Sequence, residues 1–213
     1  MSGRLTVLLV DDHAVVREGY RRLLQDRGRI AVVGEAANAV DAHRLFCRLA
    51  PSVVVMDIAL PGVSGIEGVR RIIAHDPGAR VLMFSMHDES IFVRRALDAG
   101  ALGYVTKASA PQVLIEAIDV VAAGRRFLSP DIAQALALQP LGGEAKQAAL
   151  SSREFEVLHL LVEGRTVSDI ARQLGLNPKT VFNHQSTIKQ KLDVETPTQL
   201  LRAAMRLGLM PPI

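Results

Sequence analysis

The chain has 213 residues, of which 49% are hydrophobic and 22% charged, a globular composition that is too apolar for a disordered protein. At about 100–200 residues per domain, this length allows one large domain or two small ones, and no apolar run reaches the ~18 residues that cross a bilayer. The apolar run at residues 5–10 is too short for a secretory leader, so we expect a cytoplasmic protein. The one cysteine, Cys47, excludes a disulfide framework and a zinc site built from cysteines.

The net charge is +3, and it is unevenly distributed. Residues 1–124 carry 14 basic and 14 acidic side chains, whereas residues 149–213 carry 8 basic and 6 acidic ones. This mild excess toward the C-terminus does not by itself identify a nucleic-acid-binding protein.

The first part alternates apolar runs with amphipathic stretches. The runs begin near residues 5, 30, 52, 80 and 102, and the stretches between them have apolar positions three or four residues apart. Strands that alternate with helices of this length predict a parallel sheet covered on both faces. We expect residues 1–124 to form one doubly wound, flavodoxin-like α/β domain with five strands in the order 2-1-3-4-5.

Residues 125–148 change in character. Ser129-Pro130-Asp131 is typical of the start of a short helix, and residues 139–143 have the sequence QPLGG. Proline and paired glycines followed by small and polar residues predict a linker, so we place the domain boundary here.

Residues 149–213 predict only helices, and their boundaries are well marked. The second and third helices, joined by a short turn, form a candidate helix-turn-helix. The expected boundaries are a capping box at Ser151-x-x-Glu154 with a stop at Gly164, a second helix over 167–174 closed by Gly175, a third helix from Asn177-Pro178 to Leu192, and a fourth from Thr196-Pro197 to a point before Gly208.

Polar side chains follow four of the five strands, where ligands of parallel α/β sheets bind. Asp11 and Asp12 follow the first strand, Asp57 the third, Ser85 the fourth and Lys107 the fifth. The first and third strands are neighbours in the expected order, so their three carboxylates should converge. Carboxylates this close repel one another unless a cation joins them, and Mg²⁺ with retained waters suits one or two carboxylates and a phosphate.

Asp57 is then a candidate nucleophile toward phosphorus that forms an acyl phosphate. Mg²⁺ and Lys107 can neutralise the added charge, and the Ser85 hydroxyl can donate to a phosphate oxygen. Each residue alone has a plainer interpretation: Asp12 as a helix N-cap, Ser85 as a strand-end hydroxyl, and Lys107 as a solvated cation.

Together these residues, with Asp57 in MDIALPGVSG and Lys107 in GALGYVTKAS, resemble the receiver domain of bacterial two-component response regulators over about residues 4–124. The resemblance implies phosphotransfer to Asp57 from a phosphohistidine of a sensor histidine kinase. It also implies that Mg²⁺ is bound by Asp12 and Asp57 directly, by Asp11 usually through water, and by the backbone carbonyl of Ala59.

The resemblance further implies that an aromatic residue at Tyr104 swings inward when the Ser85 hydroxyl turns toward the phosphate. That movement would couple the site to the face formed by the fifth strand and its flanking helices. The alternative for Tyr104 is an ordinary half-buried strand aromatic.

In the second domain, a helical wheel of residues 178–192 places Val181, Ile188 and Leu192 on one face. The opposite face is polar and cationic, as suits insertion in the DNA major groove, and the amides of Asn183 and Gln190 could read base edges. The alternative is a solvated helix face. Phe182 on the flank could touch a thymine methyl group, pack in a dimer or close a small core.

The run LSSREFEVLHLLVEGRTVSDIARQLGLNPKTVFNHQSTIKQKL resembles the four-helix LuxR/FixJ/NarL-type DNA-binding domain, over about residues 149–210. Members of that family commonly have lysine at the position of Phe182. Because this chain lacks that lysine, the resemblance does not determine one of the expected phosphate contacts or the DNA sequence that the protein binds. The resemblance implies that residues 200, 201 and 204 (Leu, Leu and Ala) of the fourth helix serve dimerisation; the alternative is ordinary core, and both roles are compatible. The residues expected to contact DNA are Lys179, Thr180, Phe182, Asn183, Ser186, Thr187, Lys189 and Gln190.

These features predict a response regulator of the NarL/FixJ family that binds promoter DNA as a homodimer, with RNA polymerase as a further candidate partner. A phosphohydrolase is the enzymatic alternative, but the second Asp that haloacid-dehalogenase-like phosphatases place two residues after the nucleophile is Ala59 here. We therefore expect no enzyme beyond the protein's own phosphotransfer and dephosphorylation. The glycine spacing also excludes nucleotide-binding motifs. A third hypothesis is a regulator whose receiver no longer responds to phosphate.

Overall fold

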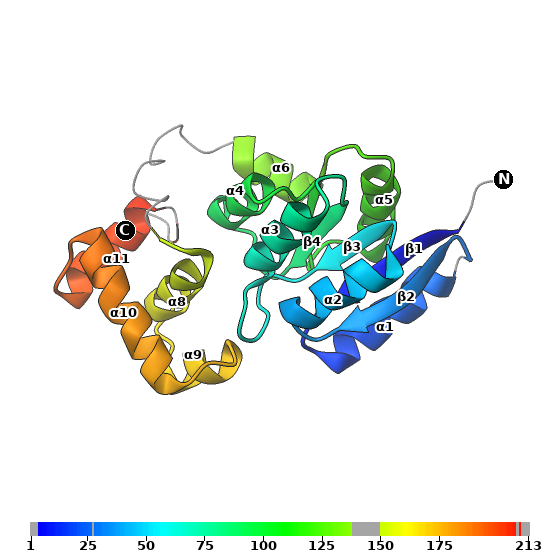
Figure 1. Ribbon diagram of the computed structural model, residues 1–213. Coiled ribbons are helices and arrows are strands. Elements are labelled where there is room, and N and C mark those ends of the chain that lie inside the picture. The colour runs from blue at the N-terminus through cyan, green and yellow to red at the C-terminus, as the bar shows by residue number, and fades with distance from the viewer. Residues whose placement is uncertain (1–3, 27, 138–149, 208, 210–213) are drawn as a thin grey trace.

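The computed structural model describes residues 4–26, 28–137, 150–207 and 209 (Figure 1). The expected linker motif at residues 139–143 lies outside these residues. The strands are β1 (Leu5–Val10), β2 (Ile30–Ala36), β3 (Val53–Met56), β4 (Val81–Ser85), β5 (Gly103–Thr106) and β6 (Phe127–Leu128). The helices that accompany them are α1 (Ala14–Asp26), α2 (Ala39–Leu49), α3 (Gly65–His75), α4 (Ser90–Asp98), α5 (Pro111–Ala122) and α6 (Pro130–Ala137). The C-terminal helices are α8 (Ser152–Val162), α9 (Val167–Gln173), α10 (Pro178–Leu192) and α11 (Pro197–Arg206).

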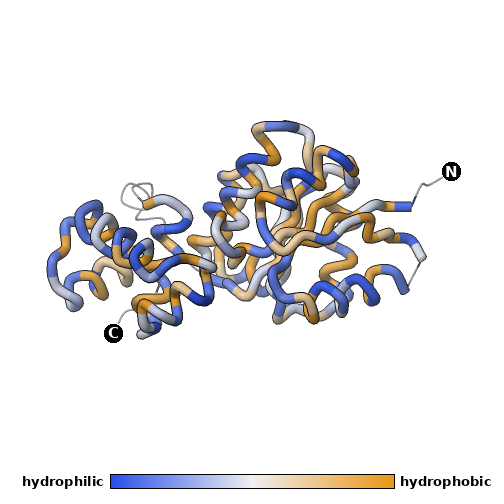
Figure 2. Tube along the Cα trace, turned by 60° about the horizontal axis from the view of Figure 1, so that its bottom comes forward, coloured by the Kyte–Doolittle hydropathy of each residue, from blue (hydrophilic) through white to orange (hydrophobic). Residues whose placement is uncertain are grey.

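All the strands pair in parallel, in the order β2-β1-β3-β4-β5-β6. The predicted order of the first five strands is confirmed. Strands β3 and β4 are buried along their whole length, which agrees with their continuous apolar sequences and with helices on both faces of the sheet. In Figure 2, orange hydrophobic stretches run through the interior of the larger domain and also alternate with blue hydrophilic stretches along the helices.

The prediction of five strands is wrong, because β6 adds a sixth to the sheet. The backbone N–H of Phe127 donates to the Leu102 carbonyl at 3.1 Å, and that of Ser129 donates to the Tyr104 carbonyl at 3.0 Å. This strand has only two residues, so it lacks the alternating pattern by which longer strands are predicted. Helix α6 begins where the Ser-Pro-Asp sequence predicts, and Thr106 Oγ1 donates to Asp131 Oδ2 at 2.7 Å. The first half of the expected linker therefore packs on the sheet domain.

The helices form two layers. Leu24 of α1 and Leu114 of α5 pack with Val7 and Val105 on one face of the sheet. Helices α2, α3 and α4 cover the other face, and the hydrophobic core on this side continues into the C-terminal helices. The two domains consequently share a packed interface, which Figure 1 shows between α4 and α8.

The C-terminal helices begin at the predicted caps. Ser151 and Glu154 form the expected capping box of α8, and Asn177 caps α10 with a proline at its first turn. Thr196 also forms a capping box with Gln199 at the start of α11. Within the described part of the chain, no helix has the length and apolar character needed to cross a membrane.

Candidate functional site

The carboxyl ends of β1 and β3 bring two buried aspartates together. Asp11 and Asp57 follow these strands directly and are 6% and 4% exposed. The backbone N–H of Asp57 donates to the Val10 carbonyl at 2.9 Å, which holds the two strand ends side by side. Burial of two acidic side chains in one place requires a compensating cation.

Lys107, which follows β5, supplies that positive charge. Its Nζ lies 2.5 Å from Asp11 Oδ2 and 2.5 Å from Asp57 Oδ2. Burial disfavours the charged ammonium, but the carboxylates of Asp57 and Asp11 outweigh this effect and raise the pKa of Lys107. Lys107 is therefore a bridging ammonium ion whose side chain is only 9% exposed, and not the solvated cation of the plainer interpretation.

Asp12 completes the acidic group. Helix α1 begins at Ala14, so the structure does not place Asp12 at the N-cap position next to that helix. Its buried Oδ1 has no hydrogen-bond partner, although His13 Nδ1 lies 2.7 Å away. Burial raises the pKa of Asp12, His13 lowers it, and the charges of Asp11 and Asp57 raise it further.

The donor set of this edge suits a hard cation. Asp11, Asp12 and Asp57 offer carboxylate oxygens, and an unsatisfied Asp12 oxygen is an available ligand atom. Half-buried Ala59 lies two residues after Asp57, in the loop that follows β3.

Ser85 and Tyr104 connect this edge to the loop before α4. Both side chains are fully buried, so Tyr104 is not the half-buried aromatic of the alternative interpretation. Ser85 Oγ accepts a hydrogen bond from the backbone N–H of His87 at 3.4 Å, and the Tyr104 hydroxyl donates to the His87 carbonyl at 2.7 Å. Burial, with neighbouring His159 and Lys107, lowers the pKa of His87 to about 4, so its ring is neutral near pH 7.

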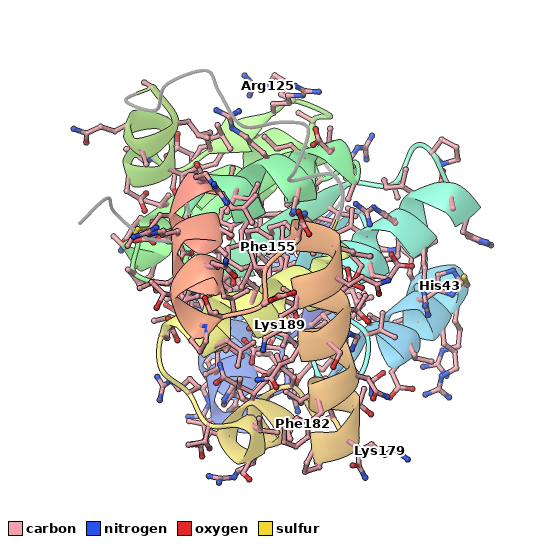
Figure 3. The ribbon with its side chains drawn as sticks, turned by 90° about the vertical axis from the view of Figure 1, so that its left-hand side faces the viewer. His43, Arg125, Phe155, Lys179, Phe182 and Lys189 are labelled. Carbon is pink, nitrogen blue, oxygen red and sulfur yellow. The ribbon has the colours of Figure 1, made fainter. Side chains whose placement is uncertain are left out.

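In the C-terminal domain, α10 has the buried face that the helical wheel predicts, made of Val181, Ile188 and Leu192. Its opposite face is open: Lys179 and Phe182, which Figure 3 labels on the N-terminal half of the helix, are both exposed. Phe182 is 57% exposed, which excludes the interpretation that it closes a small core within this conformation.

The other expected contact residues also line α10. Asn183, Ser186 and Gln190 are exposed, whereas Thr180, Thr187 and Lys189 are half-buried. The hydroxyls of Ser186 and Thr187 donate to the carbonyls of Phe182 and Asn183, at 3.1 and 3.0 Å, within the helix.

One lysine of α10 is neutralised. Lys191 Nζ lies 2.8 Å from Glu154 Oε2, and the same carboxylate belongs to the capping box of α8. The positive charge available on α10 therefore comes from Lys179 and Lys189.

Helix α11 contributes to the core of the C-terminal domain. Ala204 is fully buried, so in this conformation its side chain belongs to that core. Leu200 and Leu201 are half-buried and retain an accessible part.

The structure also reveals an interface between the two domains that the sequence analysis did not identify. Arg153 of α8 donates through Nη2 to the carbonyls of Leu60 and Gly62, at 2.8 and 2.7 Å, in the loop that follows Asp57. The Gly62 N–H donates to the Leu174 carbonyl at 3.0 Å, and a Cβ at Gly175 would lie 2.6 Å from Pro61 Cβ. Glycine is therefore needed in the turn of the helix-turn-helix for this close approach.

A second set of contacts joins α4 to α8. The Phe92 and Phe155 rings meet edge to face at 5.1 Å, and the Arg95 guanidinium lies 4.5 Å from the centre of the Phe155 ring. His159 Nε2 lies 3.1 Å from Glu89 Oε1. The loop that Ser85 and Tyr104 contact thus continues directly into an interface with the C-terminal domain.

Comparisons with known proteins agree with both halves of this description. Residues 7–119 match the response regulator receiver domain family, and residues 148–204 match the luxR family of bacterial regulatory proteins. Response regulator UvrY of Escherichia coli (strain K12) is 39% identical over 209 residues, covering 96% of this chain and 95% of that protein. Transcriptional activator protein ExaE of Pseudomonas putida is 40% identical over 208 residues, covering 96% and 97%.

Solved structures are similar as well. A LuxR-family response regulator from Aurantimonas sp. SI85-9A1 is 52% identical with a TM-score of 0.62, covering 63% of this chain and 96% of that one. RcsB of Salmonella enterica serovar Typhimurium, solved bound to promoter rprA in the presence of the phosphomimetic BeF3-, is 27% identical with a TM-score of 0.64, covering 94% and 98%.

A receiver domain with a buried acidic edge, joined to a helix-turn-helix domain, defines the class of transcriptional response regulators. Within that class, this chain belongs to the NarL/FixJ family, whose DNA-binding domain is of the LuxR type.

Proposed function

We propose that Asp57 accepts a phosphoryl group from the phosphohistidine of a sensor histidine kinase, and that the phosphorylated protein binds promoter DNA as a homodimer. The observation that supports this most is the position of Lys107 Nζ, 2.5 Å from both Asp11 and Asp57. A cation that already bridges the buried carboxylates is placed to balance charge when one of them gains a phosphoryl group.

In the proposed transfer, an Asp57 carboxylate oxygen attacks phosphorus, the phosphorus–nitrogen bond of the phosphohistidine breaks, and its electron pair stays with the departing imidazole. Asp11, Asp12, Asp57 and the Ala59 carbonyl would hold Mg²⁺, and the ion, when bound, would supply positive charge to the phosphoryl oxygens. The Lys107 ammonium group stabilises the same negative charge. To contact the phosphoryl group on Asp57, it must release one of its two present carboxylate contacts.

The signal would leave the site through Ser85. If its hydroxyl turns to donate to the phosphate, the hydrogen bond from His87 N–H is lost and the loop that Tyr104 holds can shift. That loop continues to Glu89, whose contact with His159 reaches the DNA-binding domain. Arg153 offers a second connection, because it holds the loop that follows Asp57 directly.

For DNA, we propose that α10 enters the major groove. Lys179 and Lys189 would contact phosphates, Asn183 and Gln190 would read base edges, and exposed Phe182 would touch a thymine methyl group. Thr180, Ser186 and Thr187 complete the proposed contact surface. The solved RcsB complex with promoter DNA supports this use of a related domain.

We propose that Leu200 and Leu201 of α11 form the dimer contact on DNA.

A cytoplasmic location suits both a kinase that supplies phosphohistidine and promoter DNA as the target. RNA polymerase is a candidate partner at the promoter.

Intact-mass spectrometry tests the first step. Wild type is incubated with acetyl phosphate and Mg²⁺, with Asp57→Asn as the matched control. We expect one phosphoryl group on wild type and none on the variant. A wild-type chain that never gains the group would favour the regulator that no longer responds to phosphate, and a gain that persists in Asp57→Asn would place the acceptor elsewhere.

A further inference from the structure

Helices α2 and α3 bring the chain's one cysteine between two histidines, far from the acidic edge. His43 and Cys47 lie on α2, and His75 is the last residue of α3. One ligand atom from each, the two imidazole nitrogens and the sulfur, lies within 4.8 Å of the others. We propose that these three side chains bind one borderline-soft divalent transition-metal ion, with Zn²⁺ as the representative ion.

The backbone sets up this arrangement. His43 and Cys47 are four residues apart, so they lie one turn apart on the same face of α2. Close packing of the two helices brings His75 to that face, because Gly68 of α3 has no side chain: a Cβ there would lie 3.1 Å from Ala39 Cβ of α2. The three ligands therefore come from two elements whose relative position the packing fixes.

The aromatic contacts orient the rings. His43 and His75 meet edge to face, with ring centres 5.5 Å apart and planes at 80°. Phe46, a buried residue of α2, contacts the His75 ring in the same manner at 6.3 Å. His75 thus packs against a buried aromatic ring and is itself exposed.

The ligand atoms are free to bind. In the described residues, none of the three side chains takes part in a hydrogen bond or ion pair, so no existing polar bond has to break. Cys47 and His75 are exposed, and His43, labelled on α2 in Figure 3, is half-buried. Ligands around a tetrahedral Zn²⁺ lie about 3.5 Å apart, given bonds of roughly 2.0–2.3 Å. Rotation of these side chains can close the remaining distance.

The chemistry of the set selects the metal. Two imidazoles and a thiolate are ligands for Zn²⁺ and similar ions, whereas Mg²⁺ requires oxygen. Three protein ligands leave the fourth tetrahedral position for a water molecule, as in zinc sites with three protein ligands. Binding displaces the thiol proton of Cys47, which leaves as a solvated proton.

This site is independent of phosphotransfer. Helix α3 begins at Gly65 and His75 ends it, so the cluster lies about 15 Å along the helix from the end that follows Asp57. A hard ion at the acidic edge and a softer ion at this cluster would not compete for one set of ligands. The bound ion would cross-link α2 to α3 in the receiver domain.

Cobalt and zinc titrations of the full-length chain test the proposal, in a buffer that contains Mg²⁺ and a reductant without thiols. Wild type should bind one Co²⁺ with a near-ultraviolet sulfur-to-metal charge-transfer band, and Zn²⁺ should displace it. Cys47→Ser should abolish the band. His75→Gln should weaken Zn²⁺ binding, measured against a chromophoric chelator, by more than the roughly 10–100-fold that loss of an outer-sphere partner costs.

Two controls make the result specific. His184→Gln removes a histidine outside the cluster and should bind Zn²⁺ as wild type does, and Asp57→Asn should also leave the titration unchanged. Because Cys47 and His75 are exposed, both variants should retain the metal-free melting temperature. Absence of the charge-transfer band in wild type, or wild-type Zn²⁺ affinity in Cys47→Ser and His75→Gln, would overturn the proposal.

Discussion

Glu156 lies at the interface between the domains and should make the stability of the protein depend on pH. Its side chain is buried on α8, and burial raises its pKa from 4.5 to about 7, although Arg153 and Ser64 act in the opposite direction and Asp57 raises it slightly further. Glu156 Oε2 accepts from Arg153 Nη1 at 2.6 Å, but its buried Oε1 has no hydrogen-bond partner. The unfavourable desolvation of the charged form therefore dominates.

Proton linkage gives the direction in which the stability of the protein changes with pH. The Glu156 carboxyl binds its proton more tightly in the folded protein than in the unfolded chain. The protonated carboxyl therefore contributes its full stabilisation below about pH 4.5, and this stabilisation is lost as pH rises through about 7. At roughly 1.4 kcal/mol per pKa unit, the difference between the two values corresponds to about 3 kcal/mol. Glu156→Gln is neutral and of the same shape, so it should be more stable than wild type by up to about 3 kcal/mol at pH 8.5, and nearly equal to it at pH 4.5.

Urea unfolding followed by circular dichroism, at intervals from pH 4.5 to 8.5, measures this difference directly. The comparison uses the difference between the two proteins at each pH, because all other titrating groups are common to both. Arg153→Ala should enlarge the pH dependence, since it leaves the Glu156 charge buried without its partner. Parallel stability curves for wild type and Glu156→Gln would refute the reasoning.

Three further predictions concern the DNA-binding domain. Lys179→Ala should weaken DNA binding for all sequences and reduce the slope of log affinity against log salt concentration by about one; an unchanged slope would remove Lys179 from the phosphate contacts. Asn183→Ala should weaken the preference for one base at one position of the DNA site, a discrimination worth roughly 1–3 kcal/mol. Selection of bound sequences from a random DNA pool measures this preference, and the same motif for wild type and Asn183→Ala would show that this role is wrong. Phe155→Ala should lower the free energy of unfolding by about 3–5 kcal/mol, because the ring is fully buried between Phe92 and Arg95; a loss below about 1 kcal/mol in chemical denaturation would contradict its place in the core.

Local patterns predicted most of the fold. The spacing of apolar runs indicated the first five strands and their order, and Ser, Thr and Asn caps placed the starts of α8, α10 and α11. Strand β6 was missed because two residues cannot display an alternating pattern. Its pairing depends on a neighbour that lies far away in sequence.

The acidic edge was predictable for a related reason. Parallel strands bring their carboxyl ends to one side of the sheet, so Asp11, Asp57 and Lys107 converge although 96 residues separate the first from the last. Topology alone was sufficient here, because each side chain directly follows its strand.

The interface between the domains could not be predicted in this way. Arg153 contacts Leu60 across 93 residues of sequence, and no repeating pattern relates the two positions. One signal was present: Glu156 lies in sequence between the apolar residues Phe155 and Val157, and a buried carboxylate requires a partner. The burial of Ala204 likewise depends on how the four helices pack, which a single helical wheel does not describe.

We propose that the charge state of the acidic edge controls DNA binding by α10. A fluorescently labelled DNA fragment, selected by the protein from a random-sequence pool, can be titrated with wild type and with Asp57→Asn, each with and without acetyl phosphate and Mg²⁺. We expect the phosphoryl donor to tighten binding by wild type and to leave binding by Asp57→Asn unchanged. Equal affinities for wild type with and without the donor, under conditions in which its mass shows that it is phosphorylated, would contradict the account.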